Sequence, residues 1–219
     1  MKPTASRWSV SIWFLRDNLP MNTHPYAQEI ILMAEEDRRL RGALAETGAL
    51  FEGYHPDMER LHTANARRLE NIITDIGGWP SPAQLGAEAA EAAWLIVQHA
   101  IGLPDFQRGM LGLLREAVAA GDAPAWQAAY LEDRICVFEG RPQIYGTQFD
   151  WDDAGALSPA PIENAQDVNR RRAAVGLESI EEKTSALRAR AHAEGNTAPA
   201  APAKRRKDAE DWARTAGWR

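Results

Sequence analysis

Apolar residues recur every three or four positions through most of this chain, and glycine or proline interrupts each run. The clearest run lies between Pro56 and Ile76, and Gly77 and Gly78 follow it directly. This spacing is typical of an amphipathic helix, and glycine just after the last turn is a common helix end. Because similar runs follow along the chain, we expect a mainly α-helical protein.

An earlier helix is predicted for residues 26–47, with Gly48 closing it. Its inward face is predicted to carry Ile30, Ile31, Met33 and Leu40. The charged run Glu35–Arg39, which includes Asp37, is interpreted as a face exposed to solvent.

One stretch departs from the helical pattern and predicts a β-hairpin at residues 134–149. Residues 134–138 are rich in β-branched and aromatic side chains, and residues 143–149 alternate between polar and apolar ones. Gly140 and Pro142 lie between them, where a chain reversal needs such residues. An isolated hairpin is marginally stable in water, so helices must cover it. We therefore expect a single helical domain of five or more helices with one β-hairpin packed on it and a flexible C-terminal tail.

The two ends of the chain differ from its central part. Residues 1–20 do not fit the helical pattern, and we interpret them as a leader that is disordered or that follows a start codon assigned too early. Residues 21–193 form the predicted helical domain. Residues 194–207 contain repeated alanine and proline and are predicted to be a flexible linker, and residues 208–219 are predicted to form a short C-terminal helix.

Composition narrows the classes of function. The formal net charge is −6, although residues 193–219 hold more basic than acidic side chains, so the remaining body is strongly acidic. An acidic body argues against broad binding to the phosphate backbone of nucleic acids. Cys136 is the single cysteine, which excludes an internal disulfide and a cysteine-rich zinc site. No apolar run is long enough to cross a bilayer, and we expect a cytoplasmic protein with no membrane partner.

Polar side chains on inward helix faces predict a site. His62 lies on the apolar face of the helix at residues 56–76, and His99 lies on an inward face of the next predicted helix, residues 84–101. Buried polar groups need partners, so such positions favour either a structural network or a ligand. We assign His62 or His99 as the general base and Asp133 as the group that orients it. The candidate ligand-binding residues lie on the same helices and in the predicted hairpin: Asn65, Gln98, Arg134, Gln143, Tyr145 and Gln148.

No metal ligands are assigned, and the cofactor is left unknown. A mononuclear site made by His62, His99 and one carboxylate stays open. The candidates for that carboxylate are Glu59, Glu88 and Asp133. Glu59 and His62 also have the spacing of half a di-metal helix-bundle site, but the second such pair is missing.

Several short motifs together resemble a known family. They are Gly78-Trp79-Pro80, residues 94–100 (WLIVQHA), Asp133-Arg134, residues 140–148 (GRPQIYGTQ), Arg171-Arg172 and residues 175–177 (VGL). As a set, they resemble the DUF6624 family, a bacterial family of unknown function, from about residue 25 to the end of the chain. The resemblance implies no activity. It implies only that the candidate site residues fall within the family's pattern and that residues 1–20 do not.

Two functions therefore stay open, and a third, an RNA- or DNA-associated factor that uses the tail, is the least favoured because the body is acidic. The first is a site for a small polar molecule, enzymic or not, between the inward-facing histidines and the hairpin. The second is a non-catalytic protein-interaction module whose polar interior is purely structural and whose binding surface is formed by the aromatic termini and the tail. Neither a phosphate-binding glycine loop nor a nucleophile elbow is present in the sequence. The substrate, the metal content and the oligomeric state cannot be read from these patterns.

Overall fold

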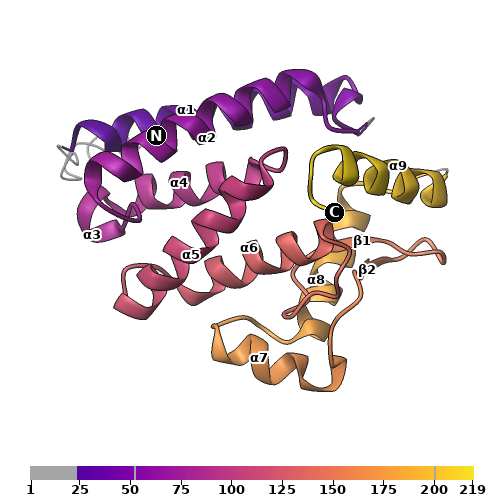
Figure 1. Ribbon diagram of the computed structural model, residues 1–219. Coiled ribbons are helices and arrows are strands. Elements are labelled where there is room, and N and C mark those ends of the chain that lie inside the picture. Colours follow the sequence, from indigo (N-terminus) through magenta and orange to yellow (C-terminus); the bar gives the residue numbers. More distant parts are fainter. Residues whose placement is uncertain (1–23, 52, 200) are drawn as a thin grey trace, which may run out of the picture.

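The computed structural model describes residues 24–51, 53–199 and 201–219, and the predicted leader lies outside them. The main body contains α1 (Pro25–Glu46), α2 (Pro56–Ile76), α4 (Ala87–His99), α5 (Pro104–Ala120) and α6 (Ala125–Phe138). Helix α1 packs against α2 and α4, and α5 packs against α6. In Figure 1, α4 lies between the α1–α2 pair and the α5–α6 pair. The mainly α-helical fold is confirmed.

The core fills the space between these helices. Fully buried side chains from each of them meet there: Ile30, Leu69, Ile72, Ile96, Leu114 and Leu131. The helix boundaries follow from proline and glycine. For example, the helix predicted at residues 84–101 is divided at Gly86, whose φ of 85° favours glycine, into α3 (Pro82–Leu85) and α4.

The hairpin predicted at residues 134–149 is wrong, because α6 continues through the first predicted strand to Phe138. Leu131 and Ile135 are four residues apart, and both are buried in the helical core. Gly140 has a φ of 73°, and the backbone N–H groups at this point bond back into the last turn of α6. The glycine that predicted a hairpin turn is thus a helix end, and core packing outweighs the β propensity of the stretch.

The hairpin of this protein begins where the predicted one ends. Strand β1 (Phe149–Trp151) pairs antiparallel with β2 (Leu157–Pro159), and these form the only sheet in the described residues. An irregular segment, residues 141–148, joins α6 to β1. Beyond β2 lie the 3-10 turn η2 (Ala165–Asp167), α7 (Val168–Ala174) and α8 (Ile180–Ala193), while the 3-10 turn η1 (Ala49–Phe51) follows α1. A helical domain with one β-hairpin packed on it is therefore confirmed, with the hairpin in a different place.

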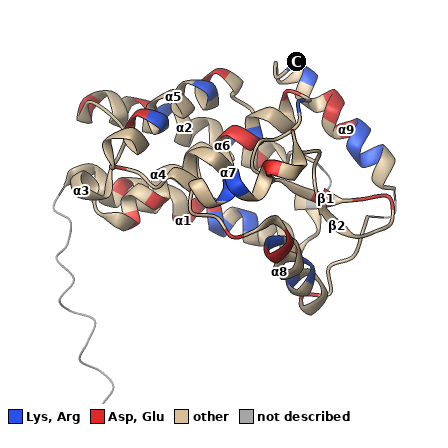
Figure 2. Ribbon diagram, turned by 90° about the horizontal axis from the view of Figure 1, so that it is seen from below, with Lys and Arg blue, Asp and Glu red and all other residues tan. Residues whose placement is uncertain are grey.

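The last helix, α9 (Pro202–Thr215), begins earlier than predicted, so the second half of the predicted linker at 194–207 is helical. Pro202 starts the helix, as proline does at a first helical position. Opposite charges four residues apart then alternate along it, as Figure 2 shows, and they pair as Lys204–Asp208 and Lys207–Asp211.

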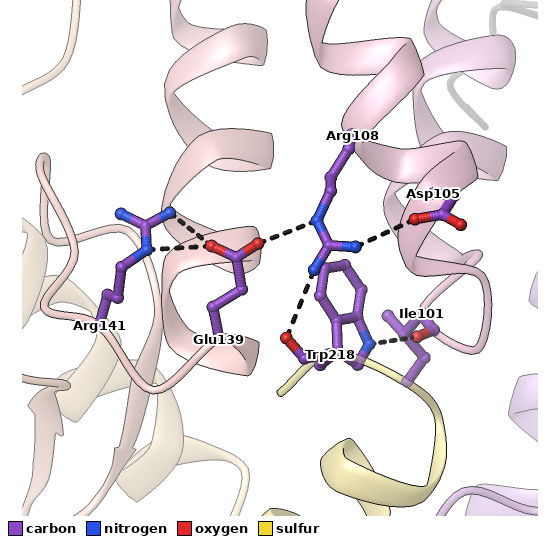
Figure 3. Close-up of polar contacts among 6 residues, drawn as sticks. All are labelled: Ile101, Asp105, Arg108, Glu139, Arg141 and Trp218. Atoms are coloured by element: carbon purple, nitrogen blue, oxygen red, sulfur yellow. Dashed lines mark hydrogen bonds and ion pairs between the residues drawn. The ribbon is translucent and has the colours of Figure 1, made fainter.

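The residues after α9 are anchored in the body rather than exposed. The Trp218 side chain is 3% exposed, and its indole N–H donates to the carbonyl of Ile101 at 2.8 Å. Arg108 lies over the indole ring and also pairs with Glu139 at the end of α6 (Figure 3). The aromatic surface expected at the C-terminus for an interaction module is therefore buried in part. None of the described helices combines the length and the apolar character needed to cross a membrane.

Candidate functional site

Three side chains from three helices converge in the body: Asp37 of α1, His62 of α2 and His99, the last residue of α4. Their ligand atoms all lie within 4.8 Å of one another, and among the described residues no other histidine, cysteine or acidic group gathers in this way. His99 Nδ1 is 2.9 Å from both carboxylate oxygens of Asp37, and His62 Nε2 is 3.0 Å from one of them. Only His99 is partly open to solvent, with 21% of its side chain exposed.

The prediction that Asp37 faces solvent is wrong, because the residue is fully buried. Ala27, Ile30, Ala34 and Asp37 are spaced by three and four residues, so they form one stripe along α1. That stripe faces the core, and Asp37 extends it towards α2 and α4. The charged neighbours of Asp37 in sequence lie on the other side of the helix and are exposed, as predicted.

The histidines determine the ionisation of Asp37. Burial raises the pKa of a carboxyl group, but the short polar contacts with His62 and His99 and the attraction of their charges outweigh it, and the pKa of Asp37 is lowered. Burial also lowers the pKa of His99, in spite of the opposing effect of Asp37. The arrangement is therefore a buried carboxylate beside a neutral His99 at neutral pH.

The second nitrogen of His62 is held by a tyrosine. Tyr54 lies between α1 and α2 in sequence, and its hydroxyl is 2.9 Å from His62 Nδ1. Burial raises the pKa of Tyr54, and the charges of Glu59 and Asp37 add to the effect. His62 Nε2 is close to Asp37 but is not aligned with any hydrogen-bond partner among the described residues. Trp212 of α9 packs edge-on against the Tyr54 ring at 5.4 Å, so the C-terminal helix supports this side of the cluster.

None of the carboxylates proposed as a third ligand belongs to the cluster. Glu88 lies in the first turn of α4, eleven residues before His99, which at 1.5 Å per residue is about 16 Å away along the helix. Glu59 influences the pKa of Tyr54 but does not reach the histidines.

Asp133 has a different role from the predicted one. Its carboxylate is fully buried and accepts backbone N–H groups of Ile144, Tyr145 and Thr147 at 2.6–3.2 Å. Burial raises the pKa of Asp133, while these backbone donors oppose the shift. The prediction that Asp133 orients a histidine is therefore corrected. Asp133 holds the irregular segment that follows α6, and Asp37 contacts the histidines instead.

Three predicted ligand-binding residues hold the same irregular segment. Gln143 donates to the carbonyls of Gln148 and Ala160 at 3.0 and 2.8 Å, and its own oxygen accepts the backbone N–H of Gln148. The carbonyl of Tyr145 accepts a hydrogen bond from Arg172 at 2.7 Å. These contacts join the segment to α7 and to the residue that follows β2, and no hydrogen bond or ion pair links Gln143, Tyr145 or Gln148 to the histidines within the described residues.

The other three predicted residues lie on the helices that carry the cluster. Asn65 donates to the carbonyl of Met33 at 3.3 Å and so ties α2 to α1. Gln98 is 3% exposed, yet neither polar atom of its side chain has a partner among the described residues. Arg134 has a buried Nε that is likewise unpaired. Burial and the charge of Arg41 lower the pKa of Arg134 to about 10, and Arg134 in turn contributes to the lowered pKa of His99.

Sequence reasoning missed three contributors to this region. Asp37 had a usable signal, since it continues a three–four stripe that begins at Ala27. Tyr54 had none, because it lies in a short connection outside any periodic run. Gln107 of α5 donates to the carbonyls of Val97 and Gln98 at the C-terminal end of α4, next to His99. Its burial between two helices depends on packing that the local sequence does not reveal.

These features define a helical protein with a buried histidine–aspartate–histidine cluster and a separate clamp built on Asp133. The chain belongs to the DUF6624 family, described as a family of unknown function, whose model matches residues 25–193. The match includes the whole cluster and the Asp133 clamp and ends before α9. Neither a curated protein nor a solved structure matches the chain.

Proposed function

We propose that Asp37, His62 and His99 bind one divalent metal ion and that the protein is an enzyme using this ion on a small polar molecule. The observation that supports the proposal is the convergence of three ligand atoms within 4.8 Å from three separate helices. Two histidines and one carboxylate form the ligand set of many zinc hydrolases and mononuclear iron enzymes, which leave other positions open for water and substrate.

The geometry fits such an ion after a small adjustment. Ligand atoms bonded to zinc at 2.0–2.2 Å in a tetrahedron are separated by about 3.4 Å. The histidine–carboxylate separations of 2.9 and 3.0 Å need a slight opening, and the two histidine nitrogens, within 4.8 Å of each other, need to approach that value. A metal on His62 Nε2 would place the proton on Nδ1, which then donates to Tyr54. Such support of a ligating histidine through its other nitrogen is a regular feature of metal sites.

The ion would activate a bound oxygen, while side chains of the protein would balance its charge and leave one side open to a substrate. A divalent ion polarises a bound oxygen and lowers the pKa of bound water. Asp37 would offset part of the ionic charge, and the partly exposed His99 marks the side from which a substrate approaches.

Metal binding by the full-length protein tests this proposal. Metal-free protein is titrated with Zn²⁺, Mn²⁺ and Fe²⁺ by calorimetry, and thermal melting is followed in parallel. We expect one ion per chain and a higher melting temperature, since a ligand that binds only the folded state stabilises it. His62→Gln and His99→Gln should abolish both effects, and Tyr54→Phe should weaken binding by about 10- to 100-fold. His192→Gln, at an exposed position of α8, is the matched control and should behave as the wild type.

Two results would contradict the proposal. In the first, the wild-type protein binds none of these ions. In the second, the ligand variants bind an ion as tightly as the control. If the histidine variants instead lose stability with no metal effect in any protein, the purely structural polar interior of a non-catalytic interaction module explains the cluster better.

A further inference from the structure

We infer that Arg134, Arg41 and Gln98 bind an oxyanion, a phosphate or carboxylate group of the substrate, beside the Asp37–His62–His99 cluster. The inference names the substrate class for the site proposed above, and it rests on that proposal for the nature of the reaction. The binding itself can be measured without the metal.

Two arginines, Arg134 of α6 and Arg41 of α1, form no ion pair with any described residue. Arg134 forms no ion pair or hydrogen bond with any described residue, and its Nε is buried. Arg41 is exposed and also lacks an ion pair in the described part of the chain, and it is near enough for its charge to affect Arg134. The Arg134 side chain is partly buried, and its Nε is enclosed by protein. Leaving a buried guanidinium nitrogen unpaired is costly, and a second cation nearby raises the cost. An anion between the two would remove both penalties.

Gln98 is a second, independent observation. Its side chain is 3% exposed, and both its amide nitrogen and its amide oxygen are unpaired among the described residues. Nearly all buried polar side chains in folded proteins have partners, so a doubly unpaired amide indicates a group that is absent from the free protein. The amide N–H₂ could donate to an anion, and the amide oxygen could accept from a hydroxyl of the same ligand.

Two aromatic contacts relate the positions of Gln98 on α4 and Arg134 on α6. Trp94 of α4 contacts Trp126 and Tyr130 of α6, with ring centroids 4.8 and 6.2 Å apart. Gln98 and Arg134 follow one turn later, four residues beyond Trp94 and Tyr130 respectively, on the same faces of their helices. The two helices run in the same direction in Figure 1, so both residues lie beyond that aromatic contact, towards the C-terminal ends of their helices.

The same residues adjoin the metal cluster. Arg41 lies one turn beyond Asp37 on α1, and Gln98 directly precedes His99 on α4. An oxyanion held by the two guanidinium groups would therefore lie next to the partly exposed side of His99. Guanidinium groups suit this task because their N–H groups match the spacing of two carboxylate or phosphate oxygens.

The experiment measures anion binding to metal-free, full-length protein. Inorganic phosphate and acetate are titrated separately by calorimetry at constant ionic strength. We expect saturable binding of at least one of them, and the tighter of the two identifies the substrate group as phosphate or carboxylate. Arg134→Gln and Arg41→Gln should each weaken it by about tenfold or more, the effect of losing one charge-assisted contact. Arg190→Gln, which removes an exposed arginine paired with Glu194 on α8, is the matched control and should leave binding unchanged.

Thermal melting without anion separates ligand binding from a structural role. Because Arg134 lacks a partner, Arg134→Gln should melt at the wild-type temperature or above it, and phosphate or acetate should stabilise the wild type more than the variant. The inference is overturned if neither anion binds, if Arg134→Gln and Arg190→Gln bind equally well, or if Arg134→Gln melts well below the wild type. If the wild-type protein binds an anion but no metal ion, only the metal proposal is overturned. If it binds a metal ion but neither anion, only this inference is overturned.

Discussion

Replacing Asp133 with asparagine tests whether this carboxylate serves the fold or the chemistry. One oxygen of Asp133 accepts the N–H groups of Ile144 and Tyr145, and the other accepts that of Thr147 at 2.9 Å. Asparagine keeps one acceptor and puts an N–H₂ group in place of the other. The Thr147 N–H would then be buried, unpaired and opposed by another donor, which should cost about 2–4 kcal/mol.

Urea unfolding followed by circular dichroism measures this cost. For a chain of this length, about 2–4 kcal/mol corresponds to a fall in melting temperature of roughly 4–16 °C. Glu132→Gln is the control, because it removes only a pair with the half-exposed Arg115 and should cost less than about 1 kcal/mol. Metal affinity should be unchanged in both variants. Wild-type stability combined with lost metal or anion binding in Asp133→Asn would refute the structural role and restore the catalytic one.

Two further predictions concern Asp37 and Trp218. Burial raises the pKa of Asp37, but its histidine partners have the larger effect, and the net shift is downward. The Asp37 carboxylate therefore stabilises the fold fully above the unfolded-state pKa near 3.9. This stabilisation is lost as the pH falls from there through the lower folded-state pKa. The difference in unfolding free energy between metal-free wild type and Asp37→Asn should therefore be smaller at pH 3 than at pH 6 in urea titrations, and a difference that grows at pH 3 would contradict this sign. Trp218→Ala should lower the free energy of unfolding by about 3–5 kcal/mol, as expected for a buried tryptophan. The control Leu32→Ala, at a side chain that is 54% exposed, should change it by no more than about 0.5 kcal/mol. Equal effects in the two variants would mean that the C-terminus is not anchored in solution.

The helices could be predicted from the sequence because their signals are local. Along α2, His62 was predicted to lie on the apolar face, and it is buried together with Met58 and Leu69. The hairpin failed for a related reason, since the stretch around Gly140 is compatible with both a hairpin turn and a helix end. The choice depends on whether Leu131 and Ile135 find a core to pack against, and that core is built from distant parts of the chain.

The candidate site could be predicted only in part. His62 and His99 were identified because polar groups on apolar helix faces are conspicuous, and they do meet. Their carboxylate was missed because Asp37 stands within a run of charged residues, where exposure is the usual outcome. Asp133 was assigned to them because it directly precedes the predicted hairpin, which was expected to lie beside the histidines. Only the packing of α1 against α4 shows which carboxylate is near.

The two buried carboxylates of this protein are satisfied in different ways, and the difference bears on function. Asp133 accepts backbone N–H groups that would otherwise be unpaired, so the fold of the irregular segment needs it. Asp37 is satisfied by two histidines that are themselves inward-facing polar groups. Three apolar side chains of similar volume could fill the same space without the cost of desolvating a charge. The metal and anion binding proposed above would give a reason for a polar cluster here, beside an unpaired arginine nitrogen and an unpaired glutamine, in place of apolar packing.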